Sequence, residues 1–484
     1  MNHIILIMAD QFRGDCIGYG GNSYIMTPYL DELASEGCYF QRGYSPSPTC
    51  IPARACMVSG MKASRTGFFS NNFEQKWEYE NTAMHSLQRG GYQTINVGKN
   101  HFKPLRSKLG FEVNKIYEVA DDENSMPSDY HLWLSREAPG VIDTAKAYSP
   151  NAWQVIPWTY DSRLHPSEWT VTAAIEQLQL RDPTRPFYLQ VSFQRPHPPL
   201  DPPKYILDLY QGIDLPGPAV GDWAPEFTCD TQCIYPFEGR INSRYLALAK
   251  KAYYASITHI DRQIGRLVQY LRKQKLYDQT TILFVSDHGE MMGDHNMFRK
   301  GPFLEGSVRI PFIAKFAKGI CDDFKGVKSS IPVSLLDLYP TFMDITGMEQ
   351  PEGLDGTSLR SLLQHPKQRK YVFSENYRKN NLITTGGAAV IGSRYKYIWN
   401  SWLGTEYLFD LQMDPDELKN CAGDSDKKEI LLEMREVLIK EYKERPKDHM
   451  LDENEKLLAG RILPSYRKPD SDKRRGREHR KMTD

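Results

Sequence analysis

The stretch H-I-I-L-I-M-A-D-Q at His3–Gln11 joins an unbroken apolar run to a polar end. A strand with one face in water alternates apolar and polar residues, whereas a strand inside a parallel sheet is apolar throughout. The run therefore predicts a parallel strand that is buried on both faces. Because ligands bind outside the carboxyl ends of such strands, Asp10 and Gln11 are the first candidates for a functional site.

Continuous apolar runs recur along the chain and alternate with segments whose apolar residues have a helical period. Three further apolar runs predict buried strands at Tyr92–Val97, Phe187–Phe193 and Thr281–Ser286. Four segments predict helices, at Thr27–Gly37, Ser167–Arg181, Ser243–Lys275 and Pro332–Gly347. Strands that alternate with helices indicate an α/β fold, in which helices cover a mostly parallel sheet.

The residues after His365 show a different pattern of predicted secondary structure. Short strand-like segments occupy Tyr371–Asn376, Ala388–Asn400 and Glu406–Leu411, and a charged helical segment occupies Asp426–Arg445. We expect two domains, a larger one over residues 1–365 and a smaller α+β one over residues 366–484, with the boundary near His365–Lys370. The basic tail Ser465–Asp484 is typical of a solvated segment or of a contact with another subunit in a homo-oligomer.

Composition excludes several classes of function. The 484 residues contain 61 Lys and Arg and 61 Asp and Glu, whereas a nucleic-acid binder has a basic excess. The first apolar run is too short to span a membrane and has no basic leader, so it does not resemble a signal peptide. We therefore expect a cytoplasmic protein that binds neither nucleic acid nor a membrane.

Polar residues follow each of the four predicted strands. The first strand ends at Asp10-Gln11, and the other three run into G-K-N-H (Gly98–His101), Q-R-P-H-P (Gln194–Pro198) and D-H-G-E (Asp287–Glu290). Because the carboxyl ends of parallel strands lie at one edge of a sheet, we expect these groups to meet there.

The chemistry of these groups suits a metal-assisted attack on an anionic ester. Mostly oxygen ligands and one imidazole come from Asp10, Gln11, Asp287 and His288. This set is typical of one hard divalent cation, Ca²⁺ first, with Mg²⁺ or Mn²⁺ as alternatives. Lys99 and Lys300 are expected to neutralise charge on the substrate, and His101 and His197 to transfer protons. For His295 we expect a structural role.

The stretch C-I-P-A-R at Cys50–Arg54 predicts a loop that enters a helix, with Pro52 in the first turn. Cys50 then lies at a helix N-terminus, where free N–H groups and the helix dipole favour an anion. Arg54 follows one turn later on the same face. From the residues alone, Cys50 is either a nucleophile or an ordinary buried cysteine.

These motifs together resemble those of the type I sulfatase family. C-I-P-A-R is similar to the family's C-x-P-x-R signature, and the other motifs follow the family's order along most of the chain. They are M-A-D-Q (Met8–Gln11), V-G-K-N-H (Val97–His101), R-P-H-P-P (Arg195–Pro199), S-D-H-G-E (Ser286–Glu290), G-D-H-N-M-F-R-K-G-P-F (Gly293–Phe303) and E-Y-L-F-D-L-Q-M-D-P-D-E (Glu406–Glu417). The resemblance implies an alkaline-phosphatase-like fold and hydrolysis of a sulfate ester. It also implies that a maturation enzyme oxidises the cysteine to formylglycine.

Carried over residue by residue, the resemblance implies a role for each match. The implied metal ligands are Asp10, Gln11, Asp287, His288 and the modified Cys50. Arg54 and Lys99 would position and polarise the formylglycine, whose hydrated aldehyde is the nucleophile. His101 would remove a proton from the geminal diol to expel sulfate. His197 and Lys300 would contact the sulfate and assist the leaving oxygen.

Three departures from the family pattern bear on the reaction. Gln11 stands where many members have a second aspartate, and His288 where many have asparagine. This Gln/His pair is also similar to phosphonate monoester hydrolases and choline-sulfatase-like enzymes. Ala53 replaces a common serine of the signature, which bears on recognition by the maturation enzyme. Two alternatives stay open: a phosphonate monoester or phosphodiester hydrolase with the same machinery, and a non-catalytic relative that acts as a binding module.

The aromatic-rich stretch Trp153–Trp169 is the candidate for recognition of the substrate's organic part. Trp158 and Tyr160 are suited to stacking on a sugar ring, and Arg163 to a carboxylate, with His165 beside them. We expect a sulfate ester of a saccharide or of an aryl alcohol. The same aromatics are equally typical of packing beneath a long loop.

Overall fold

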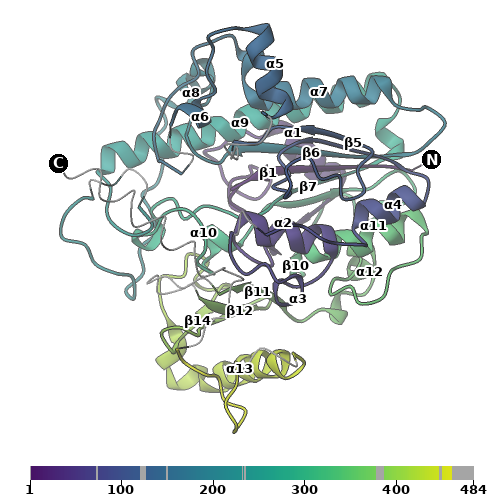
Figure 1. Ribbon diagram of the computed structural model, residues 1–484. Coiled ribbons are helices and arrows are strands. Elements are labelled where there is room, and N and C mark those ends of the chain that lie inside the picture. Colours follow the sequence, from purple (N-terminus) through teal and green to yellow (C-terminus); the bar gives the residue numbers. More distant parts are fainter. Residues whose placement is uncertain are drawn as a thin grey trace.

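The computed structural model describes residues 2–71, 75–119, 127–148, 151–231, 233, 236–377, 386–445 and 450–460. Within these ranges a large α/β body carries a small antiparallel sheet with its own helix (Figure 1). The tail Ser465–Asp484 lies outside the described residues, so its contact with another subunit stays a prediction. Among the residues that are described, no helix has the length and apolarity needed to cross a bilayer.

An eight-stranded sheet forms the centre of the large body. Across the sheet the strands are β5 (Val113–Ile116), β4 (Gln93–Gly98), β6 (Phe187–Pro196), β1 (His3–Asp10), β7 (Thr280–Ser286), β8 (Phe312–Lys315), β2 (Cys38–Phe40) and β9 (Val327–Ser329). The pairs from β5 to β7 are parallel, whereas β8 is antiparallel to both of its neighbours. The four predicted strands are confirmed as β1, β4, β6 and β7, which lie side by side.

Both faces of this sheet are covered, which explains the unbroken apolar run of β1. Ile5, Ile7 and Ala9 belong to one buried cluster, and Ile4, Leu6 and Met8 belong to another. The first cluster lies under α1 (Pro28–Glu36), α7 (Pro166–Leu180) and α9 (Ser243–Lys273). The second lies under α2 (Cys50–Ser59), α4 (Ala83–Arg89) and α11 (Leu338–Thr346), on the opposite side of the sheet in Figure 1. Burying each Ile or Leu contributes about 1.5–3 kcal/mol.

Short elements complete the large body. They are β3 (Gly43–Tyr44), β10 (Val333–Ser334), α3 (Ala63–Thr66), α5 (Asp129–Glu137), α6 (Thr144–Ala147), α8 (Lys204–Leu207), α10 (Glu305–Val308) and α12 (Leu359–Gln364). The helix predicted from Pro332 begins later than expected, because Val333 and Ser334 pair with β3. The Ser334 side chain then caps a 3₁₀ turn at Leu335–Asp337 that leads into α11.

The small C-terminal sheet is a four-stranded antiparallel meander. Its elements are β11 (Val372–Asn376), β12 (Gly387–Ile391), β13 (Tyr395–Asn400), β14 (Thr405–Asp410) and the helix α13 (Lys428–Lys443). The prediction of one strand over Ala388–Asn400 is wrong, because a tight turn closes at Gly392, whose N–H donates to the Tyr395 carbonyl at 2.9 Å. Gly392-Ser393 between the two arms is a local turn signal, which the prediction overlooked.

A buried ionic cluster joins this small sheet to the large body. Lys396, on β13, is 0% exposed, and its Nζ lies 2.9 Å from Glu305 Oε1 and 2.5 Å from Glu417 Oε1. Glu305 begins α10, and its N–H donates to Glu417 Oε2 at 2.7 Å. Burial raises the pKa of Glu417 to about 7 in spite of Lys396. Lys396 therefore neutralises charge on the buried Glu417 and on Glu305, which also lies 3.9 Å from Arg309.

Replacing Lys396 by alanine should lower the free energy of unfolding by about 3–5 kcal/mol, because it leaves the buried Glu417 without its cationic partner. The matched control is Lys370→Ala, which breaks an ion pair with Glu433 whose lysine is 70% exposed. That variant should lose less than about 1 kcal/mol. Urea unfolding of the two variants measures both quantities, and equal losses would contradict the role given to Lys396.

Candidate active site

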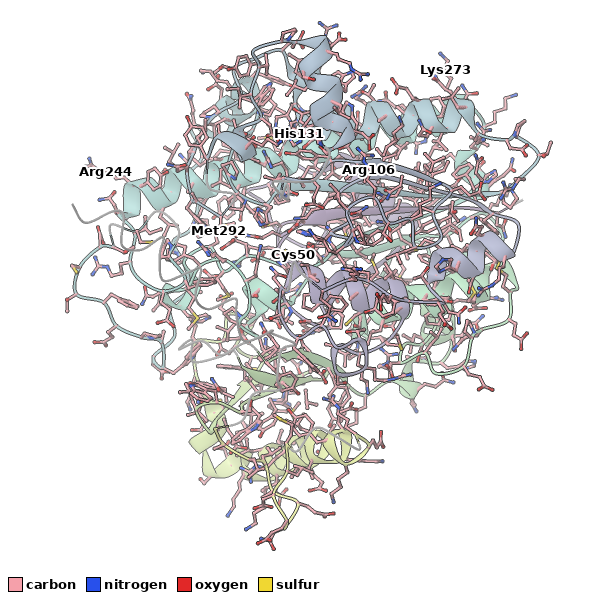
Figure 2. The ribbon with its side chains drawn as sticks, viewed as in Figure 1. Cys50, Arg106, His131, Arg244, Lys273 and Met292 are labelled. Carbon is pink, nitrogen blue, oxygen red and sulfur yellow. The ribbon has the colours of Figure 1, made fainter. Side chains whose placement is uncertain are left out.

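The four strand ends meet at one edge of the central sheet. One ligand atom each from Asp10, Cys50, Asp287 and His288 lies within 4.8 Å of the other three, and all four residues are buried. Asp10 ends β1, and Asp287 and His288 follow the neighbouring β7. Cys50 begins α2 as predicted and lies inside the large body (Figure 2). The sheet thus brings together two carboxylates, an imidazole and a thiol.

The Cys50 thiol lies among charged groups. Its Sγ is 3.0 Å from His288 Nε2 and 3.9 Å from Asp10 Oδ1. Burial and Asp10 raise the pKa of the Cys50 thiol, but Lys300, His288 and Lys99 outweigh them and the net pKa is lowered. An ordinary buried cysteine has a raised pKa, as Cys56 does on the same helix. The surroundings of Cys50 therefore favour an anion.

His288 presents a defined nitrogen to this cluster. Its Nδ1 lies 2.9 Å from the Gly289 carbonyl oxygen, which can only accept, so Nδ1 carries a proton. Nε2 then faces Cys50 and lies 3.6 Å from Asp10 Oδ1. Burial lowers the pKa of His288, but Cys50 and Asp287 raise it by more than burial lowers it. The pKa of His288 is therefore raised above its usual value. In the neutral ring the Nε2 lone pair is available to a metal ion.

Two cations compensate the two buried carboxylates. Lys99 Nζ is paired with Asp10 Oδ2, and Arg54 Nε donates to Asp287 Oδ2 at 2.9 Å. The Arg54 guanidinium also donates to Ser192 Oγ and to the Lys99 carbonyl, both at 3.0 Å. Burial raises the pKa of Asp10, but the positive charges around it, Lys99 first, hold it well below its usual range. Asp10 is therefore ionised.

Lys300 links Gln11 to His197. Its Nζ donates to Gln11 Oε1 at 2.6 Å and contacts His197 Nε2 at 2.8 Å. His197 Nδ1 lies 2.8 Å from the Pro198 carbonyl oxygen, so Nδ1 carries the proton and Nε2 accepts from Lys300. Burial and Lys300 hold the pKa of His197 well below its usual value, so this imidazole is neutral.

His101 is held by its backbone. It has a left-handed conformation with φ 60°, and its N–H donates to Glu118 Oε2 at 3.0 Å. Burial, Lys99 and Arg54 hold the pKa of His101 well below its usual value. The imidazole of His101 is therefore neutral, which is the form that can accept a proton.

Two residues of the small sheet support the site, although the sequence around them did not predict this. Asn376, from β11 of the small sheet, donates through Nδ2 to Thr49 Oγ1 and to the Gly301 carbonyl, both at 3.3 Å. Its neighbour Glu375 donates its N–H to the Pro46 carbonyl at 2.9 Å. The small sheet thus contacts both the loop before Cys50 and the loop after Lys300. The sequence pattern indicated only that Asn376 ends a strand.

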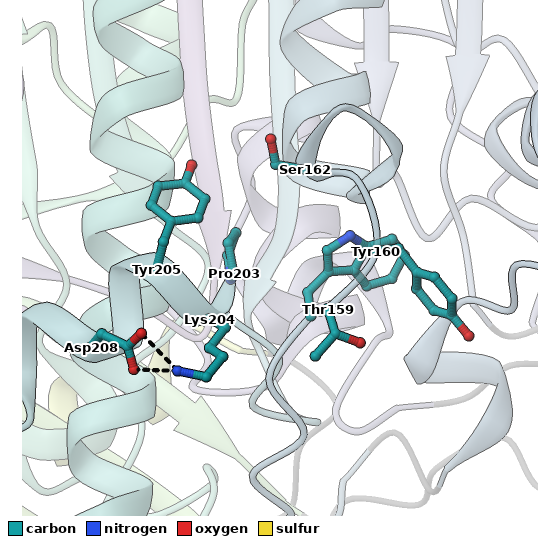
Figure 3. Close-up of a pocket in the computed structure, with 8 residues that line it drawn as sticks. Thr159, Tyr160, Ser162, Pro203, Lys204, Tyr205 and Asp208 are labelled. Carbon is teal, nitrogen blue, oxygen red and sulfur yellow. Dashed lines mark hydrogen bonds and ion pairs between the residues drawn. The ribbon is translucent and has the colours of Figure 1, made fainter.

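The aromatic stretch divides between a pocket and the interior. Trp158 and Tyr160 line a pocket of about 390 Å³ (Figure 3). The rest of its lining is Thr159, Ser162, Pro203, Lys204, Tyr205 and Asp208. Trp158 pairs with the segment that follows His197, since its N–H donates to the Pro202 carbonyl at 3.0 Å. The pocket is therefore built on the same chain segment as His197.

The two other histidines singled out in the sequence have partners within the protein. His165 is 1% exposed, its Nδ1 accepts from the Ser167 N–H at the start of α7, and it is absent from the pocket lining. Its contact with substrate stays a prediction. His295 is buried against Trp223, and its Nδ1 accepts from the Gly221 N–H, which confirms the expected structural role.

Family models match most of the chain. The model of the sulfatase family matches residues 2–348. A second model, described as N-sulphoglucosamine sulphohydrolase, C-terminal, matches residues 293–444. The first covers the central sheet and the site residues, and the second includes the small sheet and α13.

Individual relatives agree with these matches. An arylsulfatase of Clostridium perfringens (strain 13 / Type A) is 37% identical over 477 residues, which cover 95% of this chain and 97% of the relative. A choline-sulfatase of Rhizobium meliloti (strain 1021) is 29% identical, with 87% and 82% covered. The solved structure of a phosphonate monoester hydrolase of Agrobacterium radiobacter is 26% identical, with a TM-score of 0.77 and 92% and 96% covered. The chain therefore belongs to the sulfatase family of the alkaline phosphatase-like superfamily and is a hydrolase of sulfate esters.

Proposed function

We propose that the chain hydrolyses its sulfate ester with Cys50, converted to formylglycine, beside a bound divalent cation. The observation that carries the proposal is the buried cluster of Asp10, Cys50, Asp287 and His288 within 4.8 Å. Conversion of Cys50 needs a formylglycine-generating maturation enzyme. The hydrated formylglycine supplies the nucleophilic oxygen, which an unmodified thiol would not.

The donor set around Cys50 fits a hard cation. Asp10 and Asp287 offer carboxylate oxygens, Gln11 an amide oxygen and His288 the Nε2 nitrogen. Oxygen-rich sets of this kind are typical of Ca²⁺, which we propose first, and of Mg²⁺ or Mn²⁺. The cation supplies positive charge to the nucleophile and to the sulfate oxygens.

The remaining residues divide the work of binding and proton transfer. Arg54 and Lys99 hold the modified side chain in place, since both already lie against the carboxylates beside Cys50. Lys300 and His197 form one hydrogen-bonded pair that contacts the sulfate, and Lys300 assists the leaving oxygen. His101, held neutral, accepts a proton at the modified residue so that sulfate can depart.

The organic part of the substrate is proposed to be a saccharide or an aryl alcohol. The pocket of about 390 Å³ supports this proposal, because it combines aromatic rings with the hydroxyl groups of Thr159 and Ser162. The backbone hydrogen bond from Trp158 to Pro202 links this pocket to the segment that follows His197, which also supports the proposal.

Mass spectrometry of the peptide that contains Cys50, from protein made in its native host, tests the nucleophile. We expect the thiol to be replaced by an aldehyde. Cys50→Ala should lower kcat/KM by a factor on the order of 10³ or more, because it removes the attacking group. Cys56→Ala is the matched control, a buried cysteine of the same helix, and should retain activity. Unmodified Cys50 in a fully active sample would contradict the proposal.

Removal of the cation should destabilise the fold as well as stop the reaction. Without it, the carboxylates of Asp10 and Asp287 lose a counter-charge. A ligand at about 100 times its Kd adds about 2.7 kcal/mol to the free energy of unfolding. Thermal unfolding of chelator-treated protein should therefore show a Tm that rises with added Ca²⁺, and Asp287→Asn should reduce that rise. A Tm that no divalent cation moves would speak against a metal site.

Hydrolysis of a phosphonate monoester or phosphodiester is the competing function, favoured by Gln11, His288 and the likeness to the Agrobacterium enzyme. Such esters carry one negative charge, as a sulfate monoester does, so the same cations suit both. We expect kcat/KM for an aryl sulfate to exceed, by about tenfold or more, that for a phosphonate or phosphodiester with the same aryl group. The reverse order would assign the phosphorus ester, and no turnover of either by matured protein would indicate a binding module.

A further inference from the structure

The side-chain amide of Gln11 is held at both of its ends. Its Nε2 donates to Glu290 Oε2, and its Oε1 accepts from Lys300 Nζ at 2.6 Å. A carboxylate can only accept and an ammonium group can only donate. Turning the amide by half a turn would set oxygen against the carboxylate and nitrogen against the ammonium group. The two partners therefore select one orientation of the amide.

Glu290 is itself fixed in place. It is 1% exposed, and its Oε1 accepts from the backbone N–H groups of Met292, at 3.0 Å, and Arg299, at 2.5 Å. These two bonds occupy one oxygen and leave Oε2 directed at Gln11. Oε2 is thus the oxygen of Glu290 that remains to accept from Gln11.

The backbone of Gln11 is fixed as well. Its φ of 67° is unusual for a residue with a side chain. Its N–H donates to Asp287 Oδ1 at 3.2 Å, and its carbonyl accepts from the Tyr253 hydroxyl at 2.5 Å. Because the backbone is held in this way, the orientation of the Gln11 side chain depends on the partners of its terminal amide.

We propose that Glu290 is a positioning residue that fixes the polarity of the Gln11 amide, so that oxygen rather than nitrogen is presented to the cation. The inference rests on the proposed function, because it takes the cation to lie between Gln11 and the carboxylates of Asp10 and Asp287. An amide nitrogen has no lone pair to give to a cation. An aspartate at this position offers an oxygen in either orientation and needs no such partner, whereas a glutamine does.

The test replaces the acceptor by a donor of the same shape. In Glu290→Gln, the new amide oxygen still accepts from Met292 and Arg299, so its NH₂ group faces Gln11 and favours the turned amide. We expect the Ca²⁺ Kd, measured by calorimetry on the full chain, to rise about 10- to 100-fold. Calorimetry needs no turnover, so the result does not depend on the reaction.

The double variant Gln11→Glu with Glu290→Gln supplies the rescue. The introduced NH₂ group now donates to the introduced carboxylate, whose second oxygen faces Lys300 and the cation. Its Kd should return to within a few-fold of the original chain. Gln11→Glu alone sets two buried carboxylates against each other. The double variant should therefore bind Ca²⁺ at least about tenfold more tightly than Gln11→Glu does. If Glu290→Gln does not fold, the comparison of the double variant with Gln11→Glu tests the role of Glu290.

Glu441→Gln, in a buried ion-paired glutamate of α13, is the control and should leave the Kd unchanged. An unchanged Kd in Glu290→Gln would overturn the inference, as would a folded double variant that binds no more tightly than Gln11→Glu. In both cases Ca²⁺ binding by the original chain would still support the proposed function. Failure of the original chain to bind any of Ca²⁺, Mg²⁺ or Mn²⁺ would instead overturn the metal site itself, and the inference with it.

Discussion

The burial of two carboxylates on neighbouring strands is the constraint on which the site depends. Asp10 and Asp287 are both 0% exposed, and an ionised group in such a place is costly unless it is paired and hydrogen-bonded. Lys99 from the end of β4 and Arg54 from α2 provide that pairing. Because each cation comes from a different element, the need to compensate the carboxylates also fixes α2, and with it Cys50, against the sheet.

The same charges set the protonation of three histidines differently. His101 and His197 lie beside lysines, which together with burial keep their imidazoles neutral. His288 lies beside the Cys50 thiol and Asp287, which raise its pKa instead. The imidazoles of one cavity therefore differ in protonation, with His101 and His197 held neutral and the charged form favoured at His288.

The small C-terminal sheet is part of the site's support. Lys396 joins it to the large body through Glu305 and Glu417, and Asn376 connects the loops that carry Cys50 and Lys300. These contacts are buried and polar, so they hold one relative placement of the two sheets more strictly than apolar packing does. The loop that leads into Cys50 is therefore held from both sides, by the central sheet and by β11.

The sequence by itself determined the strands β1, β4, β6 and β7 and the residues at their carboxyl ends. It could do so because burial on both faces leaves an unbroken apolar run, which is a local pattern. The tertiary structure alone decided that Asn376 contacts Thr49 and Gly301, and that Glu290 meets Gln11. The last pair is separated by 279 positions. Such contacts depend on how strands align and loops fold back, and local periodicity carries no information about either.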